Sequence, residues 1–202
     1  MLPWGTEDDV RFRIEALELQ LRAHKHLALL PTLSLSSARN QAQAAELCFC
    51  TEPQLAAELV EFHTLPAGRI LKNSLSAFAL DAPEKGKRGE LERLLLRAAS
   101  FRSVSSDEYD AIVLAVIEKA PQCGADFVKR LQSEALQVRA LLMLGKYKPA
   151  YLLAVRVGRK SVREVLEWGK TPSATRKLCS KFLSKQGEKV EASLLAKLDA
   201  TE

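Results

Sequence analysis

The most constraining feature of the sequence is a run of short apolar segments, each closed by glycine, in its last third. Apolar residues recur there at the three- and four-residue spacing of a helix, and glycine next to lysine or arginine follows at 145–146, 158–159 and 169–170. Gly187 marks a fourth break. The pattern predicts five helices, at 132–144, 149–157, 161–168, 173–185 and 188–198.

None of these segments is long enough to bury an apolar face by itself, which is the logic of helices stacked in a repeat array. Neither a fixed period nor a tetratricopeptide signature is visible in the sequence. Leucine and alanine dominate the apolar residues, and both favour helix over strand. We therefore expect an all-α fold of stacked antiparallel helix pairs, resembling an α-solenoid.

Helix signals continue through the first half of the chain. They predict a long first helix opened by Thr6, in which Val10, Ile14, Leu17 and Leu21 recur at helical spacing, and which Pro31 stops. The further starts expected are Ser37 as the cap of 38–50, Thr51 before Pro53, residues 70–78, and a helix from Glu90. Ser105 or Ser106 is expected to cap a helix through the apolar run 111–117, for which a buried strand is the alternative. Pro121 and Gly124 are expected to end that helix.

The domain organisation expected is one helical solenoid fragment spanning 1–202. The polar, glycine-containing stretch at 81–89 is a possible internal linker. It would separate the N-terminal helices of 6–80 from a C-terminal helical array of 90–198.

Charge is unevenly distributed along the chain. The net charge is +5, yet residues 139–189 contain thirteen Lys or Arg against three Glu, a net +10. Basic surfaces attract acidic proteins, anionic lipid headgroups or nucleic acid. A solvated helix face is the plainer interpretation. The candidate partner or anion surface consists of Arg156, Arg159, Lys160, Arg163, Arg176, Lys177 and Lys181.

Aromatic residues in the same region have two interpretations. Tyr147, Tyr151, Trp168 and Phe182 lie near helix ends or at helical spacing, which favours packing anchors between adjacent helices. An interface hot spot is the alternative.

Sequence motifs for catalysis are missing. No P-loop, dinucleotide-binding glycine motif or zinc-protease motif occurs. His24 and His26 would point to different sides of a helix, about 200° apart, and a cationic His63 would suit a helix end. Cys48, Cys50, Cys123 and Cys179 have no zinc-ribbon spacing, and free thiols are expected over disulfides because no secretion signal is visible. We expect no enzyme site, cofactor or transmembrane span.

One segment resembles a known family. Residues 138–155 read VRALLMLGKYKPAYLLAV, and a leucine–cysteine pair follows at 178–179 before Phe182 and Leu183. This order is similar to the C-terminal helical region of the spastizin family of FYVE-finger proteins. Weaker similarity covers residues 9–21 and 30–33.

The resemblance implies an end-piece of an α-solenoid that acts in endosome and lysosome trafficking, autophagic lysosome reformation and cytokinesis. It implies spatacsin and the fifth adaptor protein complex as partners, and the cytosolic face of late endosomes and lysosomes as the location. The FYVE finger that binds phosphatidylinositol 3-phosphate has no counterpart here, so membrane association is expected to be indirect. The family offers no catalytic residues to carry over.

Overall fold

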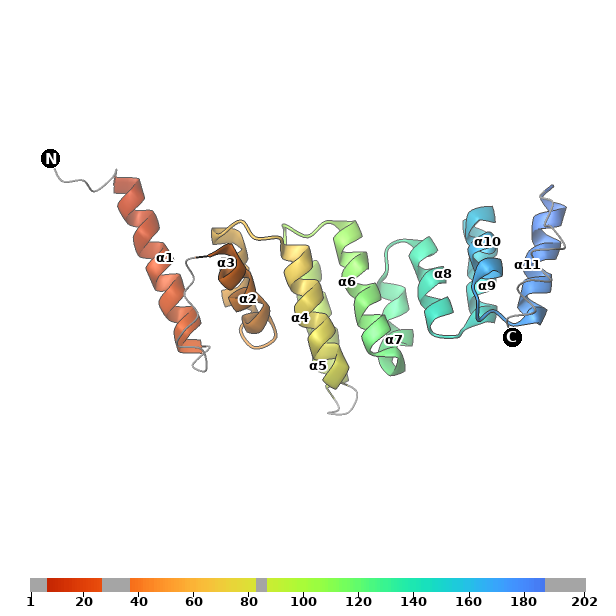
Figure 1. Cartoon of the computed structure of the whole chain (residues 1–202), viewed down its shortest axis with the longest axis horizontal. Helices are drawn as coiled ribbons and strands as arrows, with labels where there is room; N and C mark the ends of the chain where they lie inside the picture. The colour runs from red at the N-terminus through yellow and green to blue at the C-terminus, as the bar shows by residue number, and fades with distance from the viewer. Residues whose placement is uncertain (1–6, 27–36, 83–86, 188–202) are drawn as a thin grey trace. The chain divides into compact units, whose positions relative to one another are not determined.

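The computed structural model describes residues 7–26, 37–82 and 87–187, and every regular element within these ranges is helical. This confirms the expected all-α class (Figure 1). In order the α-helices are α1 (Glu7–His26), α2 (Ala38–Phe49), α3 (Pro53–Phe62), α4 (Ala67–Asp81), α5 (Arg88–Ala99), α6 (Ser106–Lys119), α7 (Pro121–Phe127), α8 (Glu134–Met143), α9 (Tyr147–Val157), α10 (Arg159–Glu167) and α11 (Ser173–Lys185). A 3₁₀ turn, η1 (Val128–Arg130), follows α7.

The chain divides into two compact units, Met1–Ile112 and Val113–Glu202. The expected linker at 81–89 lies wholly inside the first unit. Within it, α4 ends at Asp81, α5 begins at Arg88, and these two helices pack against each other. Residues 83–86 lie outside the described residues, so a linker function for this segment stays a prediction.

The main helix contacts of the first unit join helices one or two positions apart along the chain. The helices α2 and α3 form a hairpin, α4 packs on both α2 and α5, and α1 lies against α3. Each large buried side chain contributes about 1.5–3 kcal/mol through removal from water. The largest fully buried apolar residues of this unit are Phe49, Leu59, Ile70, Leu71, Leu75, Leu91, Leu95 and Ile112.

The second unit repeats this scheme in shorter helices. Consecutive helices from α8 to α11 pack in pairs, and α8 also contacts α10 while α9 contacts α11. Fully buried Ala150 and Ala154 lie one turn apart on α9, where their small side chains let neighbouring helices approach closely. The shared core consists of Val138, Leu142, Ala150, Ala154, Val162, Val165, Leu166, Cys179 and Leu183.

Several predicted helix starts are confirmed by hydrogen bonds. The Asn40 amide donates to Ser37 Oγ at 3.3 Å, and Ser105 caps α6 through a reciprocal capping box with Glu108. The prediction that Thr51 caps the helix that begins at Pro53 was wrong. Glu52 occupies that position, and the Thr51 hydroxyl instead donates to the carbonyl of Cys48 at 3.3 Å.

The predicted breaks are mostly correct. Gly145, Gly158 and Gly187 have φ values of 69°, 130° and 80°, a region in which residues with a Cβ are strained. The run 111–117 is helical, because it lies inside α6. The predicted helix at 188–198 lies outside the described residues, as does the predicted stop at Pro31.

Gly124 was expected to end a helix but lies buried inside α7. A Cβ built there would lie 2.9 Å from Leu144 Cδ2 and 3.1 Å from Ile117 Cγ2. A side chain at this position would therefore require the Leu144 and Ile117 side chains to shift.

We expect Gly124→Ala to lower the free energy of unfolding by about 1 kcal/mol, because overpacking outweighs the gain in helix propensity. Gly89→Ala in α5 is the matched control. No heavy atom lies within 4 Å of its Cβ position, so it should stabilise the chain by about 0.5–1 kcal/mol. Urea denaturation measures both, and stabilisation by both variants would contradict the packing assigned to Gly124.

Candidate partner-binding surface

Helix α10 separates its side chains sharply into two faces. Ser161, Val162, Val165 and Leu166 are buried on one face. The other face exposes Arg159, Lys160 and Arg163 to solvent. The positive charges of α10 therefore lie on the side opposite to the core.

Helix α11 has the same arrangement. Lys177 and Lys181 are exposed one turn apart, while Cys179 and Leu183 enter the core. Arg159 Nη2 donates to Gln186 Oε1 at 3.3 Å, which joins the start of α10 to the end of α11. Because these neighbouring helices run in opposite directions, Arg163 lies at about the level of Lys181.

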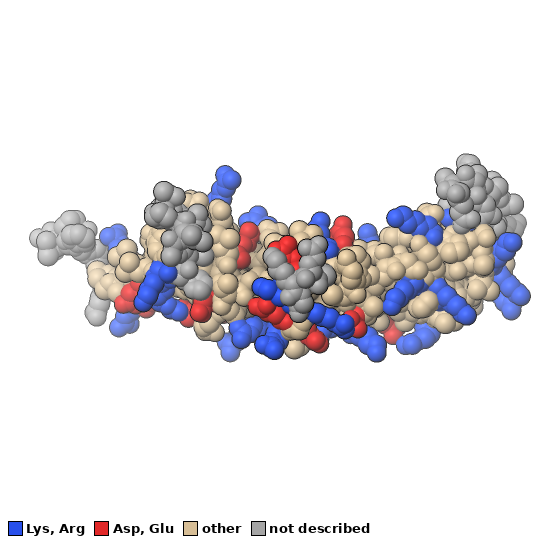
Figure 2. All heavy atoms as spheres, turned by 90° about the horizontal axis from the view of Figure 1, so that it is seen from below, with Lys and Arg blue, Asp and Glu red and all other residues tan. Residues whose placement is uncertain are grey.

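Lysine and arginine outnumber acidic side chains over the part of the second unit visible in Figure 2, where α9 to α11 lie. We call the exposed residues Arg159, Lys160, Arg163, Lys177 and Lys181 the basic surface. It has the sign and the exposure that an acidic protein surface would require.

Arg156 is exposed but has an acidic partner. Its Nη2 lies 3.0 Å from Glu134 Oε1 on α8, and both side chains are solvent-exposed. Such a pair contributes at most about 1 kcal/mol. Glu134 precedes the basic segment in the sequence, so a charge count along the chain could not show that it offsets Arg156.

Arg176 was wrongly placed on this surface. Its side chain is only 1% exposed, and Nη2 donates to the Gly169 carbonyl at 2.9 Å. Thr171, also buried, donates to the Val165 carbonyl at 2.8 Å. Together they hold the loop between α10 and α11, where helix ends leave backbone carbonyls in need of donors.

The four aromatic candidates have a common environment. Tyr147, Tyr151, Trp168 and Phe182 are partly buried and pack against the core of the second unit. Their positions correspond to packing between adjacent helices, and each retains some exposed area at the rim of the core.

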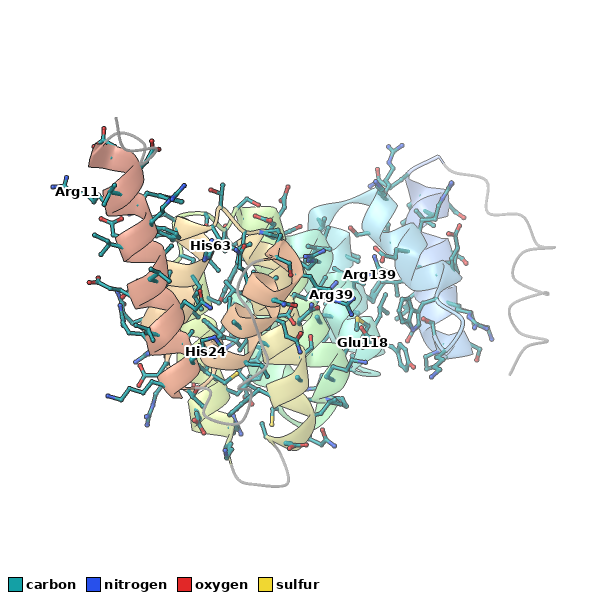
Figure 3. All side chains as sticks on the ribbon, turned by 60° about the vertical axis from the view of Figure 1, so that its left-hand side comes forward. Arg11, His24, Arg39, His63, Glu118 and Arg139 are labelled. Carbon is teal, nitrogen blue, oxygen red and sulfur yellow. The ribbon has the colours of Figure 1, made fainter. Side chains whose placement is uncertain are left out.

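The remaining candidate residues lie apart from one another. His24 is on α1 and His63 follows α3 (Figure 3). The His63 ring is edge-on to the Phe62 ring, with centroids 4.9 Å apart. Burial lowers the pKa of His63, which opposes the cationic form that would suit a helix end. No cluster of three or more metal-ligating side chains occurs in the described ranges.

The four cysteines are free thiols. Burial raises the pKa of Cys48, Cys50 and Cys179 to about 11. These thiols are therefore protonated at neutral pH, whereas a nucleophilic cysteine needs a lowered pKa. None of the helices in the described ranges is both long and apolar enough to cross a membrane.

A groove that the sequence did not suggest lies between α2 and α4 in the first unit. It has a volume of about 670 Å³ and is lined in part by Arg39, Glu46, Arg69 and Asn73. Asn73 Nδ2 donates to Glu46 Oε1 at 2.7 Å within it. Its residues come from separate parts of the sequence, so no local sequence pattern predicts the groove.

Replacing Arg176 tests its structural assignment. We expect Arg176→Ala to lower the free energy of unfolding by about 2–4 kcal/mol, because it removes buried volume and a charged donor to a carbonyl. The adjacent exposed position gives the control, since Lys177→Ala should change stability by less than about 0.5 kcal/mol. An equal change in the free energy of unfolding for both variants, measured by urea denaturation, would contradict the structural role assigned to Arg176.

Comparison with known proteins gives one match. Residues 66–184 match the family described as "ZFYVE26-like, TPR repeats", in which ZFYVE26 is spastizin. No curated protein and no solved structure matches the chain. The match covers more than half of the sequence, and helical repeats of this kind form protein-interaction scaffolds. The chain therefore belongs to the ZFYVE26-like TPR-repeat family and contains a spastizin-like helical region.

Proposed function

We propose that this chain is a non-enzymatic scaffold that mediates protein–protein interactions in endosome and lysosome trafficking. Autophagic lysosome reformation and cytokinesis are the processes that the spastizin resemblance suggests. The proposed location is the cytosolic face of late endosomes and lysosomes. Family membership and the packed helix pairs support the scaffold function.

The observation that carries the proposal is the basic surface. Its side chains face solvent on two neighbouring helices whose opposite faces build the core. A partner could therefore engage the charges without disturbing the packing. We propose spatacsin and the fifth adaptor protein complex as partners, with an acidic patch on one of them facing this surface.

A second candidate function is binding of nucleic acid or an anionic membrane through residues 139–189. The net +10 of this segment favours it. Such binding releases counterions or depends on a charged surface, so it weakens steeply as salt rises. Arg156 lies beside Glu134 and Arg176 is buried, which leaves fewer positive charges available than the segment contains.

Charge reversal tests the proposal. The variant Lys160→Glu/Lys177→Glu/Lys181→Glu should weaken binding of the purified chain to purified spatacsin or the fifth adaptor complex by about tenfold. The variant Lys72→Glu/Arg93→Glu/Arg102→Glu, at exposed positions of the first unit, changes net charge equally and should bind as the wild type does. Circular dichroism checks that both variants keep their helix content.

Two results would overturn the proposal. One is failure of the wild-type chain to bind either partner at physiological salt. The other is equal weakening by both variants, since that would show a dependence on total charge and not on this surface. Salt-sensitive binding to RNA, DNA or phosphatidylserine vesicles without partner binding would support the second candidate.

A further inference from the structure

Helix α1 carries two apolar stripes, and only one of them is covered. On the covered side, Leu19 and Ala23 are buried. The Phe12 ring stacks on Phe62 with centroids 4.7 Å apart, although Phe12 remains 57% exposed. Arg22 pairs with Glu58 of α3 at the same contact. These contacts hold α1 against the rest of the first unit.

The second stripe consists of Val10, Ile14, Leu17 and Leu21, which are 41%, 51%, 59% and 68% exposed. These are the residues whose spacing predicted the helix, yet they point away from the core. Four aligned aliphatic side chains on one turn after another form a continuous apolar strip, a feature that marks interaction sites on protein surfaces. Arg11, which borders this strip, also extends away from the first unit in Figure 3.

The spacing of the strip is that of a coiled coil. Intervals of four, three and four residues place Val10 and Leu17 at d positions and Ile14 and Leu21 at a positions of a heptad. In parallel coiled coils, a β-branched residue at a with leucine at d favours two strands. Ile14 and Leu17 follow this pattern, whereas Val10 at d and Leu21 at a do not.

The flanking charges fit a second copy of the same helix. In a parallel pair, Arg13 at g faces Glu18 at e of the other copy, and two-fold symmetry forms this opposite-charge contact twice. The next such contact joins Gln20 to Lys25 and brings no like charges together. The e and g positions are therefore compatible with a second copy of α1.

The seam is short, since 20 residues of helix span about 30 Å. An isolated helix of that length is marginal in water. Here α1 is already held in place by Phe12, Leu19, Ala23 and Arg22, so association does not have to form the helix. A weak dimer, with a dissociation constant on the order of micromolar, is the affinity that such a seam supports.

We propose that α1 joins two copies of this chain through a parallel two-helix seam formed by Val10, Ile14, Leu17 and Leu21. This interface uses none of the residues of the basic surface. The proposal is independent of which protein binds that basic surface.

Analytical ultracentrifugation over a range of concentrations tests the proposal. The wild-type chain should shift from monomer to dimer, and Leu17→Glu should raise the dissociation constant at least about a hundredfold by placing like charges in the seam. Leu80→Glu on α4 is the matched control, because Leu80 is 58% exposed against 59% for Leu17. That variant should dimerise as the wild type does.

A charge swap tests the parallel register. Arg13→Glu and Glu18→Arg should each weaken the dimer by placing like charges across the seam, and the double variant should restore it. A wild-type chain that stays monomeric at every concentration would overturn the proposal. The apolar strip would then be expected to contact another helix or a lipid surface. A dimer insensitive to Leu17→Glu, or a double variant that fails to recover, would also contradict it.

Discussion

Close packing between helices one or two positions apart along the chain holds each unit together. In the second unit, α8 contacts α10 and α9 contacts α11, in addition to the hairpin contacts. Ala150 and Ala154 leave room for this, because a larger side chain at either position would separate the helices. Stability is thus a sum of local interfaces, and each helix keeps an outer face that packing does not use.

Both proposed interaction surfaces lie on such outer faces. The basic surface covers the outside of α10 and α11, and the apolar strip covers the outside of α1. Packing and surface charge use adjacent residues in α11. Lys177 is exposed, whereas its neighbour Arg176 is buried and holds the loop before α11 through the Gly169 carbonyl. A scaffold of this type needs surfaces of defined chemistry and not an enclosed site.

Local sequence signals predicted the helices, the caps at Ser37 and Ser105, and the glycine turns well, because propensity and capping act within a few residues. Predictions that depended on tertiary contacts were less successful. The burial of Arg176 depends on the fold around α11, which its neighbours in the sequence do not indicate. Glycine's low helix propensity predicts a stop at Gly124, whereas its position inside α7 depends on packing against Leu144, twenty residues later. The spacing of Val10, Ile14, Leu17 and Leu21 identified a helix but not which of its two apolar stripes would face the core.

Hydrogen exchange of the Leu142→Ala variant measures how far a packing defect in α8 spreads along the chain. Leu142 on α8 is buried in the core of the second unit, and its truncation should cost about 2–5 kcal/mol. We expect faster amide exchange in α8 and in its contact partners α9 and α10, while α2 to α4 keep their wild-type rates. Equal acceleration throughout the chain, or acceleration confined to α8, would contradict the account.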